Sequence, residues 1–192
     1  MKKTNILYKI FYSTLPDLSF LNKSKRLTNA ERALFVLPSI LDEILVGLLL
    51  GDLCAQKISE KGNTNLHFVQ GIVHKDYLYH LYGLFKEFCN LESKITNRLP
   101  DVRTNKIYNQ IQFHTYSLPC FNKYHELFYS TGTKIIPSNI SKLLTYQGLA
   151  YWAMDDGNKT GTGFRLNTQS FTKDENLFLV KILKDKFDLD WP

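Results

Sequence analysis

The sequence has few cysteines and no long apolar run, and these absences exclude several classes of protein. Cys54, Cys89 and Cys120 form no CxxC pair, and the five histidines are not spaced with them as metal ligands. We therefore expect neither a zinc site nor a disulfide framework, and we expect a reducing compartment. The longest apolar run, Ile44 to Leu50, is far shorter than the roughly 20 residues that cross a bilayer. We expect no membrane span and no secretory signal.

Acidic residues are also in short supply. Eighteen aspartates and glutamates face 24 lysines and arginines, which gives a formal net charge of +6. This balance suits a polyanionic partner, because lysine and arginine replace the counterions condensed on a phosphate backbone. The same charge also fits an ordinary solvated surface. An apolar content of 44% over 192 residues is enough for a folded core, which excludes a disordered chain. Residues with AT-rich codons are abundant and indicate an AT-rich genome, such as that of an organelle.

The order of predicted elements repeats along the chain. Apolar residues at helical spacing predict helices at 39–52, 74–90, 121–128 and 149–156 and a last helix from residue 172, and alternation predicts hairpins within 56–70, 94–117 and around 164–167. We therefore expect an α+β fold with pseudo-twofold αββαββα repeats. The predicted parts are an N-terminal arm (1–37), a first repeat (38–137) and a second repeat (138–192) that lacks its second hairpin and last helix.

Capping residues predict where three of these helices begin. Ser39 and Thr145 are N-cap candidates for the helices that open the two repeats. Thr172 and Glu175 have the spacing of a capping box in front of the last helix.

The two repeat-opening helices each end in an aspartate, Asp52 and Asp156. Gly47 and Gly51 are four residues apart and lie on one face of the first helix, where small residues let a partner helix approach closely. If the two helices pair, the two carboxylates meet in a basic groove. Like charges at that distance repel unless a divalent cation neutralises them, and Mg²⁺ suits such hard oxygen ligands.

Leu45 to Leu53, LVGLLLGDL, and Leu149 to Gly157, LAYWAMDDG, both resemble the nine-residue motif of the LAGLIDADG homing endonucleases. The segments ILVGLLLGD, KIIP (134–137) and LNTQSF (166–171) resemble the organellar, intron-encoded, two-repeat branch of that family. The resemblance covers about residues 27–192.

The eighth position of the motif is the metal-binding acid, which the resemblance assigns to Asp52 and Asp156. Asp155 competes with Asp156, which the register of the motif favours. Leu53 replaces the final glycine of the first motif, and Tyr151 and Asp155 occupy positions that are usually small.

The resemblance implies a site-specific double-strand DNA endonuclease that uses Mg²⁺ or Mn²⁺ and serves intron homing in a mitochondrion or chloroplast. It implies a monomer where a full-length second repeat is present. Two alternatives stay open: a maturase that binds its intron RNA and helps it splice, and an inactive remnant of an endonuclease.

In the family, the hairpins form a curved sheet that lies in the DNA major groove. Alternation along the strands then gives the groove-facing candidates, whose amides, imidazoles and guanidinium suit base edges: Asn63, Asn65, His67, Gln110, Gln112, His114, Arg165 and Asn167. The same faces also fit an ordinary solvated sheet. Lys134 is expected to contact phosphate. Gln70 and Gln169 end their strands near the catalytic helices and are expected to position water or phosphate.

Overall fold

The computed structural model describes residues 26–189, apart from residues 90, 98–104, 106 and 162. The chain forms two compact units. The first consists of Met1–Pro38 and Cys54–Asn122, and the second of Ser39–Leu53 and Lys123–Pro192. Most of the N-terminal arm predicted at 1–37 lies outside the described residues. The described part of that segment contains a short helix, α2 (Asn29–Ala33), which opens with a capping box between Thr28 and Glu31.

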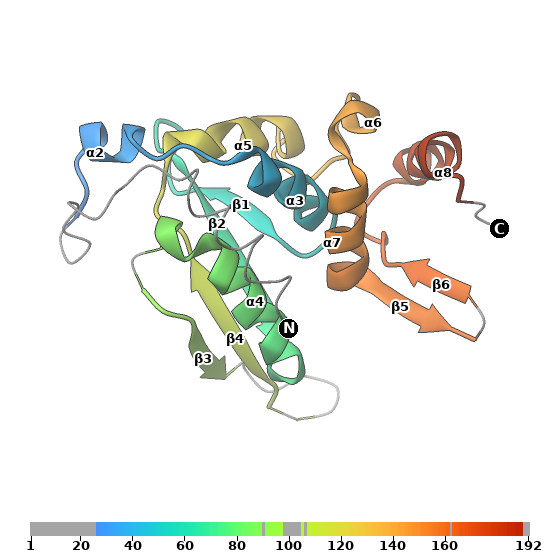
Figure 1. The fold of residues 1–192 in the computed structure, drawn as a ribbon, viewed down its shortest axis with the longest axis horizontal. Coiled ribbons are helices and arrows are strands. Elements are labelled where there is room, and N and C mark those ends of the chain that lie inside the picture. The colour runs from blue at the N-terminus through green and yellow to red at the C-terminus, as the bar shows by residue number, and fades with distance from the viewer. Residues whose placement is uncertain (1–25, 90, 98–104, 106, 162, 190–192) are drawn as a thin grey trace, which may run out of the picture. The chain divides into compact units, whose positions relative to one another are not determined.

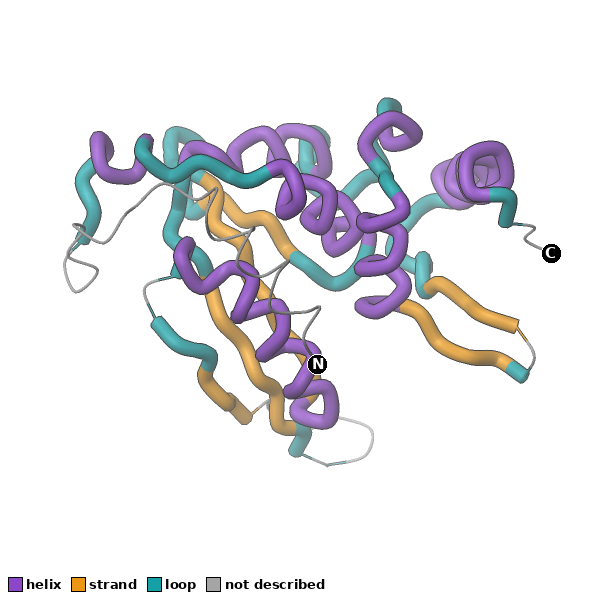
Figure 2. The backbone as a smooth tube through the Cα atoms, viewed as in Figure 1, coloured by secondary structure: helices purple, strands orange, loops and turns teal. Residues whose placement is uncertain are grey.

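The first unit is built on a four-stranded antiparallel sheet. Its strands lie in the order β1 (Cys54–Lys57), β2 (Thr64–Gly71), β4 (Asn109–His114) and β3 (Lys94–Asn97). Helix α4 (Lys75–Phe85) follows β2 through the 3-10 turn η1 (Ile72–His74) and contacts β2 and β4. Two further 3-10 turns, η2 (Lys86–Phe88) and η3 (Pro119–Phe121), complete the unit. Figure 2 shows its strands in orange and its helices in purple.

Alternation of side chains gives this sheet one apolar face and one polar face. Leu66 and Phe68 on β2 and Ile111 and Phe113 on β4 are buried, whereas the residues between them are half-buried and mainly polar. The rings of Phe68 and Phe113 stack with centroids 4.3 Å apart, and Phe85 of α4 lies 5.1 Å from Phe68. The apolar face is therefore the one that α4 covers.

The second unit is built around two helices, α3 (Ser39–Leu50) and α7 (Tyr146–Asp156), which contact each other along their length (Figure 1). Each residue of α3 from Ile44 to Leu50 is buried. Most of α5 (Asn122–Phe128) and the short α6 (Ile140–Leu143) lie in this unit. A two-stranded hairpin, β5 (Gly157–Thr160) and β6 (Gly163–Leu166), follows α7 directly, and α8 (Lys173–Phe187) comes next.

The predicted α+β class and the repeated order of elements are confirmed. The order α3, β1, β2, α4 returns as α7, β5, β6, α8. Ser39 is the first residue of α3 rather than a residue in front of it, and the helix predicted at 74–90 divides into α4 and η2. The compact units cut across the repeats predicted at 38–137 and 138–192, because α3 pairs with α7. Within the described part of the chain, no helix combines the length and the apolar character that a membrane crossing requires.

The predicted capping box of α8 is present and generates a stability prediction. Thr172 Oγ1 accepts the N–H of Glu175 at 3.3 Å, and Glu175 Oε2 accepts the N–H of Thr172 at 2.8 Å. We expect Thr172→Ala to lower the free energy of unfolding by about 1 kcal/mol, since it removes the hydroxyl that caps the helix. Urea denaturation followed by circular dichroism measures this. Lys173→Ala, at the exposed neighbouring position, is the control, and equal midpoints for the two variants would contradict the prediction.

Candidate active site

Helices α3 and α7 approach each other backbone to backbone. A Cβ placed on Gly47 would lie 1.9 Å from the carbonyl oxygen of Gly148, and a Cβ placed on Gly148 would lie 2.9 Å from the carbonyl oxygen of Glu43. Real Cβ atoms do not approach that closely, so only glycine fits at Gly47. The predicted contact face of α3 is confirmed, and Gly148 is its counterpart on α7.

The contact continues to the ends of both helices. A Cβ on Gly51 would lie 2.4 Å from Asp155 Oδ2, so the Asp155 carboxylate occupies the space beside this glycine. The same oxygen accepts the backbone N–H of Asp52 at 2.7 Å. Gly148 and Asp155 are seven residues apart, which is two helical turns, and they therefore lie on one face of α7.

The opposite end of the helix pair is joined through the cap of α7. Thr145 Oγ1 accepts the N–H of Gly148 at 3.2 Å, which confirms Thr145 as the N-cap. The same hydroxyl donates to Glu43 Oε2 on α3 at 2.7 Å. Glycine in the middle and hydrogen bonds at both ends thus fix how the two helices lie against each other.

Three carboxyl groups gather where the helices end: Asp52, Asp155 and Asp156. Burial raises the pKa of Asp155 to about 7; the N–H of Asp52 opposes this rise, and the charges of Asp52 and Asp156 add to it. Burial also raises the pKa of Asp156 to about 6, and the charge of Asp52 contributes. The electrostatic effect of Asp52 on Asp156 indicates that the two predicted ligands lie near each other within one unit.

The carboxylates of Asp52 and Asp156 form a donor set that fits a hard divalent cation. Carboxylate oxygens are the ligands that Mg²⁺ and Ca²⁺ prefer, and a cation would relieve the repulsion that adds to the effect of burial on these two pKa values. Although three carboxyl groups gather here, no three histidine, cysteine, aspartate or glutamate side chains among the described residues are arranged to hold one metal ion together. Two carboxylates with water and phosphate oxygens in the other positions are a usual environment for Mg²⁺.

Lys134 belongs to the same site. Its Nζ donates to the carbonyl oxygen of Gly51, and its positive charge lowers the pKa of both Asp155 and Asp156. The positively charged ammonium group of Lys134 would also attract phosphate here, which is the role that the sequence predicts for this residue.

Asn167 and Gln169 follow β6 in the second unit. Asn167 donates to the carbonyl oxygen of Asp156 through its backbone N–H, at 3.1 Å, and through its side-chain amide, at 2.8 Å. Gln169 is exposed, and its amide lies 3.5 Å from Asn167 Oδ1. Asn167 thereby holds the end of α7. Its contact with DNA stays a prediction.

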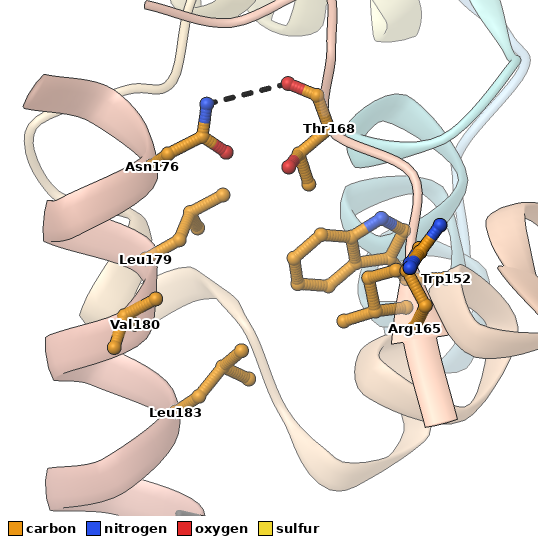
Figure 3. A pocket seen from close by; sticks show the side chains of 8 residues that line it. Trp152, Arg165, Thr168, Asn176, Leu179, Val180 and Leu183 are labelled. Carbon is orange, nitrogen blue, oxygen red and sulfur yellow. Dashed lines mark hydrogen bonds between the residues drawn. The ribbon is translucent and has the colours of Figure 1, made fainter. Parts of the chain in front are cut away.

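Arg165, on β6, lines a cavity of about 210 Å³ between β6 and α8 (Figure 3). Trp152 lies on one side of the cavity, and Leu179 and Leu183 of α8 lie on the other. The buried indole Nε1 of Trp152 has no hydrogen-bond partner among the described residues. Arg165 itself is exposed, as a DNA contact requires.

The other predicted DNA contacts lie in the first unit. His67 and His114 face each other across β2 and β4 with stacked rings 4.0 Å apart, and His67 Nε2 lies 2.9 Å from Gln112 Oε1. Burial lowers the pKa of His114, and the neighbouring His67 adds to this effect. The predicted residues Asn65, His67, Gln110, Gln112 and His114 are all half-buried on this polar face of the sheet.

Two predicted residues of this unit differ from that pattern. Asn63 precedes β2 and accepts a hydrogen bond from the amide of Asn122 at 3.1 Å. Gln70 alternates with Phe68 onto the face that α4 covers, and it belongs to the first unit, whereas Asp52 and Asp156 belong to the second. Its part in the site stays a prediction.

Sequence reasoning missed the contacts that Gly148 and Asp155 make. The nine-residue motif starts at Leu149, one residue after Gly148, and its third and seventh positions in the second copy are Tyr151 and Asp155. Both residues depart from the small side chains that the motif predicts at a close contact. The seven-residue spacing of Gly148 and Asp155 was the signal that could have placed them on the contact face.

The two paired helices end in aspartates, and each helix is followed by a hairpin and a further helix. This repeated arrangement defines a protein with an acidic centre built from two related halves. A model of the LAGLIDADG DNA endonuclease family matches residues 42–192. The chain belongs to that family.

The relatives include both maturases and endonucleases. Over 154 residues the chain is 34% identical to the cytochrome b mRNA maturase bI2 of Debaryomyces hansenii, a match that covers 77% of this chain and 56% of the maturase. The DNA endonuclease I-ChuI of Chlamydomonas applanata is 28% identical, over 77% of this chain and 73% of the relative. The chain therefore spans about half the length of the maturase.

A solved structure has the same fold. It is the homing endonuclease I-WcaI bound to its DNA recognition sequence, with a TM-score of 0.74 and 28% identity over 81% of this chain and 70% of that one. This similarity confirms the predicted homing endonuclease-like fold.

The close approach at Gly47 generates a prediction. We expect Gly47→Ala to lower the free energy of unfolding by about 3 kcal/mol, the upper end of the usual range for overpacking, because the new methyl group meets a backbone oxygen that cannot turn away. Gly163→Ala on β6, where the nearest atom is an ordinary 3.5 Å away, is the matched control. Chemical denaturation measures both, and a Gly47→Ala variant as stable as the control would show that the helices do not meet at this glycine.

The raised pKa values predict a pH-dependent stability. Asp155 and Asp156 bind protons more tightly in the folded protein than at their usual pKa of 3.8, so unfolding releases protons between these values. In the absence of metal, the contribution of these two groups to the free energy of unfolding falls as pH rises from about 4. It is fully lost above about pH 7. We expect Mg²⁺ to raise the thermal unfolding midpoint at about pH 8 and to have little effect at about pH 5.

The control for this prediction is the double variant Asp155→Asn, Asp156→Asn, measured by differential scanning fluorimetry at both pH values, with and without Mg²⁺. In this double variant, we expect a smaller decline in stability toward high pH than in the native chain. We also expect Mg²⁺ to raise the thermal unfolding midpoint by less. An equal response of the variant and the native chain would place the cation elsewhere.

Proposed function

We propose that this chain acts as a site-specific double-strand DNA endonuclease that hydrolyses phosphodiester bonds with a divalent cation. The observation that carries the proposal is the meeting of Asp52, Asp155 and Asp156 at the ends of one closely paired set of helices. Family membership and the similarity to a homing endonuclease bound to DNA support it.

The carboxylates of Asp52 and Asp156 would hold the cation, Mg²⁺ or Mn²⁺, which would polarise the phosphate and lower the pKa of bound water. Lys134, whose Nζ lies against the Gly51 carbonyl, offers positive charge toward the phosphate as negative charge develops on it. Gln169 is exposed beside Asn167 and can orient water or phosphate, and Gln70 has the same proposed role.

The polar face of the first unit's sheet supplies base contacts in the major groove. Amide and imidazole groups there match the donors and acceptors of base edges, and the net charge of +6 favours the phosphate backbone. Arg165 and Asn167 would extend this contact from the second unit, and Asn63 from the start of β2. We propose intron homing in an organelle, a mitochondrion first, as the biological setting, with residues 38–137 and 138–192 as the two repeats and a monomer as the assembly where a full-length second repeat is present.

A second function, maturase activity on intron RNA, is favoured by one observation, the 34% identity to the maturase of Debaryomyces hansenii. RNA binding needs the basic surface but not the cation. The two functions therefore depend differently on Asp52 and Asp156.

We expect Asp52→Asn and Asp156→Asn to reduce DNA cleavage by more than about 100-fold, since even the partners of metal ligands contribute 10- to 100-fold. DNA affinity should stay close to that of the native chain. The assay selects cleaved sequences from a plasmid library with random inserts in the presence of Mg²⁺, then measures cleavage of a recovered site. Asp185→Asn, on the exposed side of α8, is the matched control.

Full cutting by either variant would end the assignment of these carboxylates. If neither the native chain nor the variants cleave DNA, and splicing assistance survives Asp52→Asn, the results would favour the maturase function.

A further inference from the structure

The peptide group between Gly51 and Asp52 is held at both of its polar ends. Its carbonyl oxygen accepts a hydrogen bond from Lys134 Nζ, and its N–H donates to Asp155 Oδ2 at 2.7 Å. A peptide group is planar and rigid, so two contacts at opposite ends fix the orientation of its plane. This plane leads directly into the Cα of Asp52, from which its side chain branches.

Asp52 needs such support because it lies beyond the helix. Helix α3 ends at Leu50, and Gly51 and Asp52 form a turn in which Leu53 N–H returns to the carbonyl oxygen of Leu48 at 3.1 Å. The Asp52 side chain is exposed, so the packing of α3 does not by itself determine where it points.

Among the described residues, no corresponding side chain supports the other half of the site. The residue that matches Asp155 in the first motif is Gly51, which has no side chain to reach toward Asp156. The end of α7 is held in a different way, through the two hydrogen bonds that Asn167 donates to the Asp156 carbonyl oxygen. The two aspartates are therefore positioned by unlike contacts.

We propose that Asp155 is a positioning residue, which orients Asp52 by accepting its backbone N–H, and that it is not itself a metal ligand. The proposal rests on the proposed function of Asp52. It gives the site a built-in asymmetry, because loss of the Asp155 oxygen disturbs the half that contains Asp52 and leaves Asp156 with its own support.

A DNA duplex presents two scissile phosphates related by a twofold axis, and under the proposed function each aspartate would serve one of them. Loss of the Asp155 contact should therefore slow the cutting of one strand more than the other. Nicked DNA then accumulates before double-strand breaks form.

The test compares Asp155→Ala with Asp155→Asn on a duplex whose strands carry different labels. Asparagine keeps an oxygen that can accept the Asp52 N–H but loses the charge, whereas alanine loses both. We expect Asp155→Ala to slow one strand by about 10- to 100-fold, as loss of a partner to a metal ligand does. Asp155→Asn should cut both strands within a few-fold of the native rate, and Asp185→Ala is the control.

A second readout needs neither DNA nor metal. Hydrogen exchange at the Asp52 amide, followed by NMR at a pH where all variants are folded, reports directly on the bond to Asp155. We expect faster exchange in Asp155→Ala and near-native exchange in Asp155→Asn.

Two results would overturn the proposal: unchanged exchange in Asp155→Ala, or cleavage by Asp155→Asn as weak as that of the alanine variant, which would make Asp155 a ligand. If the native chain cuts no DNA, the proposed endonuclease function fails, while the exchange measurement still decides whether Asp155 holds the Asp52 backbone.

Discussion

The close approach of α3 and α7 is the constraint on which the acidic site depends. Because the Gly47 Cα and the Gly148 carbonyl oxygen leave no room for a methyl group, the two helix axes lie as near as backbones allow. That distance lets a side chain at the end of α7 bond to the backbone just after α3. With larger residues in the middle, the ends would separate, and Asp52 would no longer share a site with Asp155 and Asp156.

The same closeness creates an electrostatic cost. Three carboxyl groups meet where burial and mutual repulsion raise the pKa of two of them into the range of about 6 to 7. Lys134 offsets part of this cost with a single positive charge. Buried carboxyl groups whose charges destabilise the folded protein are typical of a functional site, because a structural pairing of the helices would be served better by neutral side chains.

Much of this was visible in the sequence. Two helix–hairpin–helix units, the glycine face of α3 and the meeting of the two motif ends follow from periodicity and spacing. The partner face on α7 did not, because aligning the motifs pairs Gly47 with Tyr151, whereas the helices actually meet at Gly148. Nor could alternation show that the Asn167 amide turns to the Asp156 carbonyl oxygen, since strand periodicity gives the face of a residue and not its partner.

The seventh positions of the two motifs are best understood as a pair. An aspartate in place of Gly51 would put its Cβ only 2.4 Å from Asp155 Oδ2, in space that the Asp155 carboxylate already occupies. Two glycines would remove the acceptor that now holds the Asp52 N–H. One glycine and one aspartate satisfy both the packing and the hydrogen bond, and this combination is necessarily unsymmetrical. The departure at Asp155, which looked in the sequence like a weakening of the helix contact, is thus part of what keeps the two ends together.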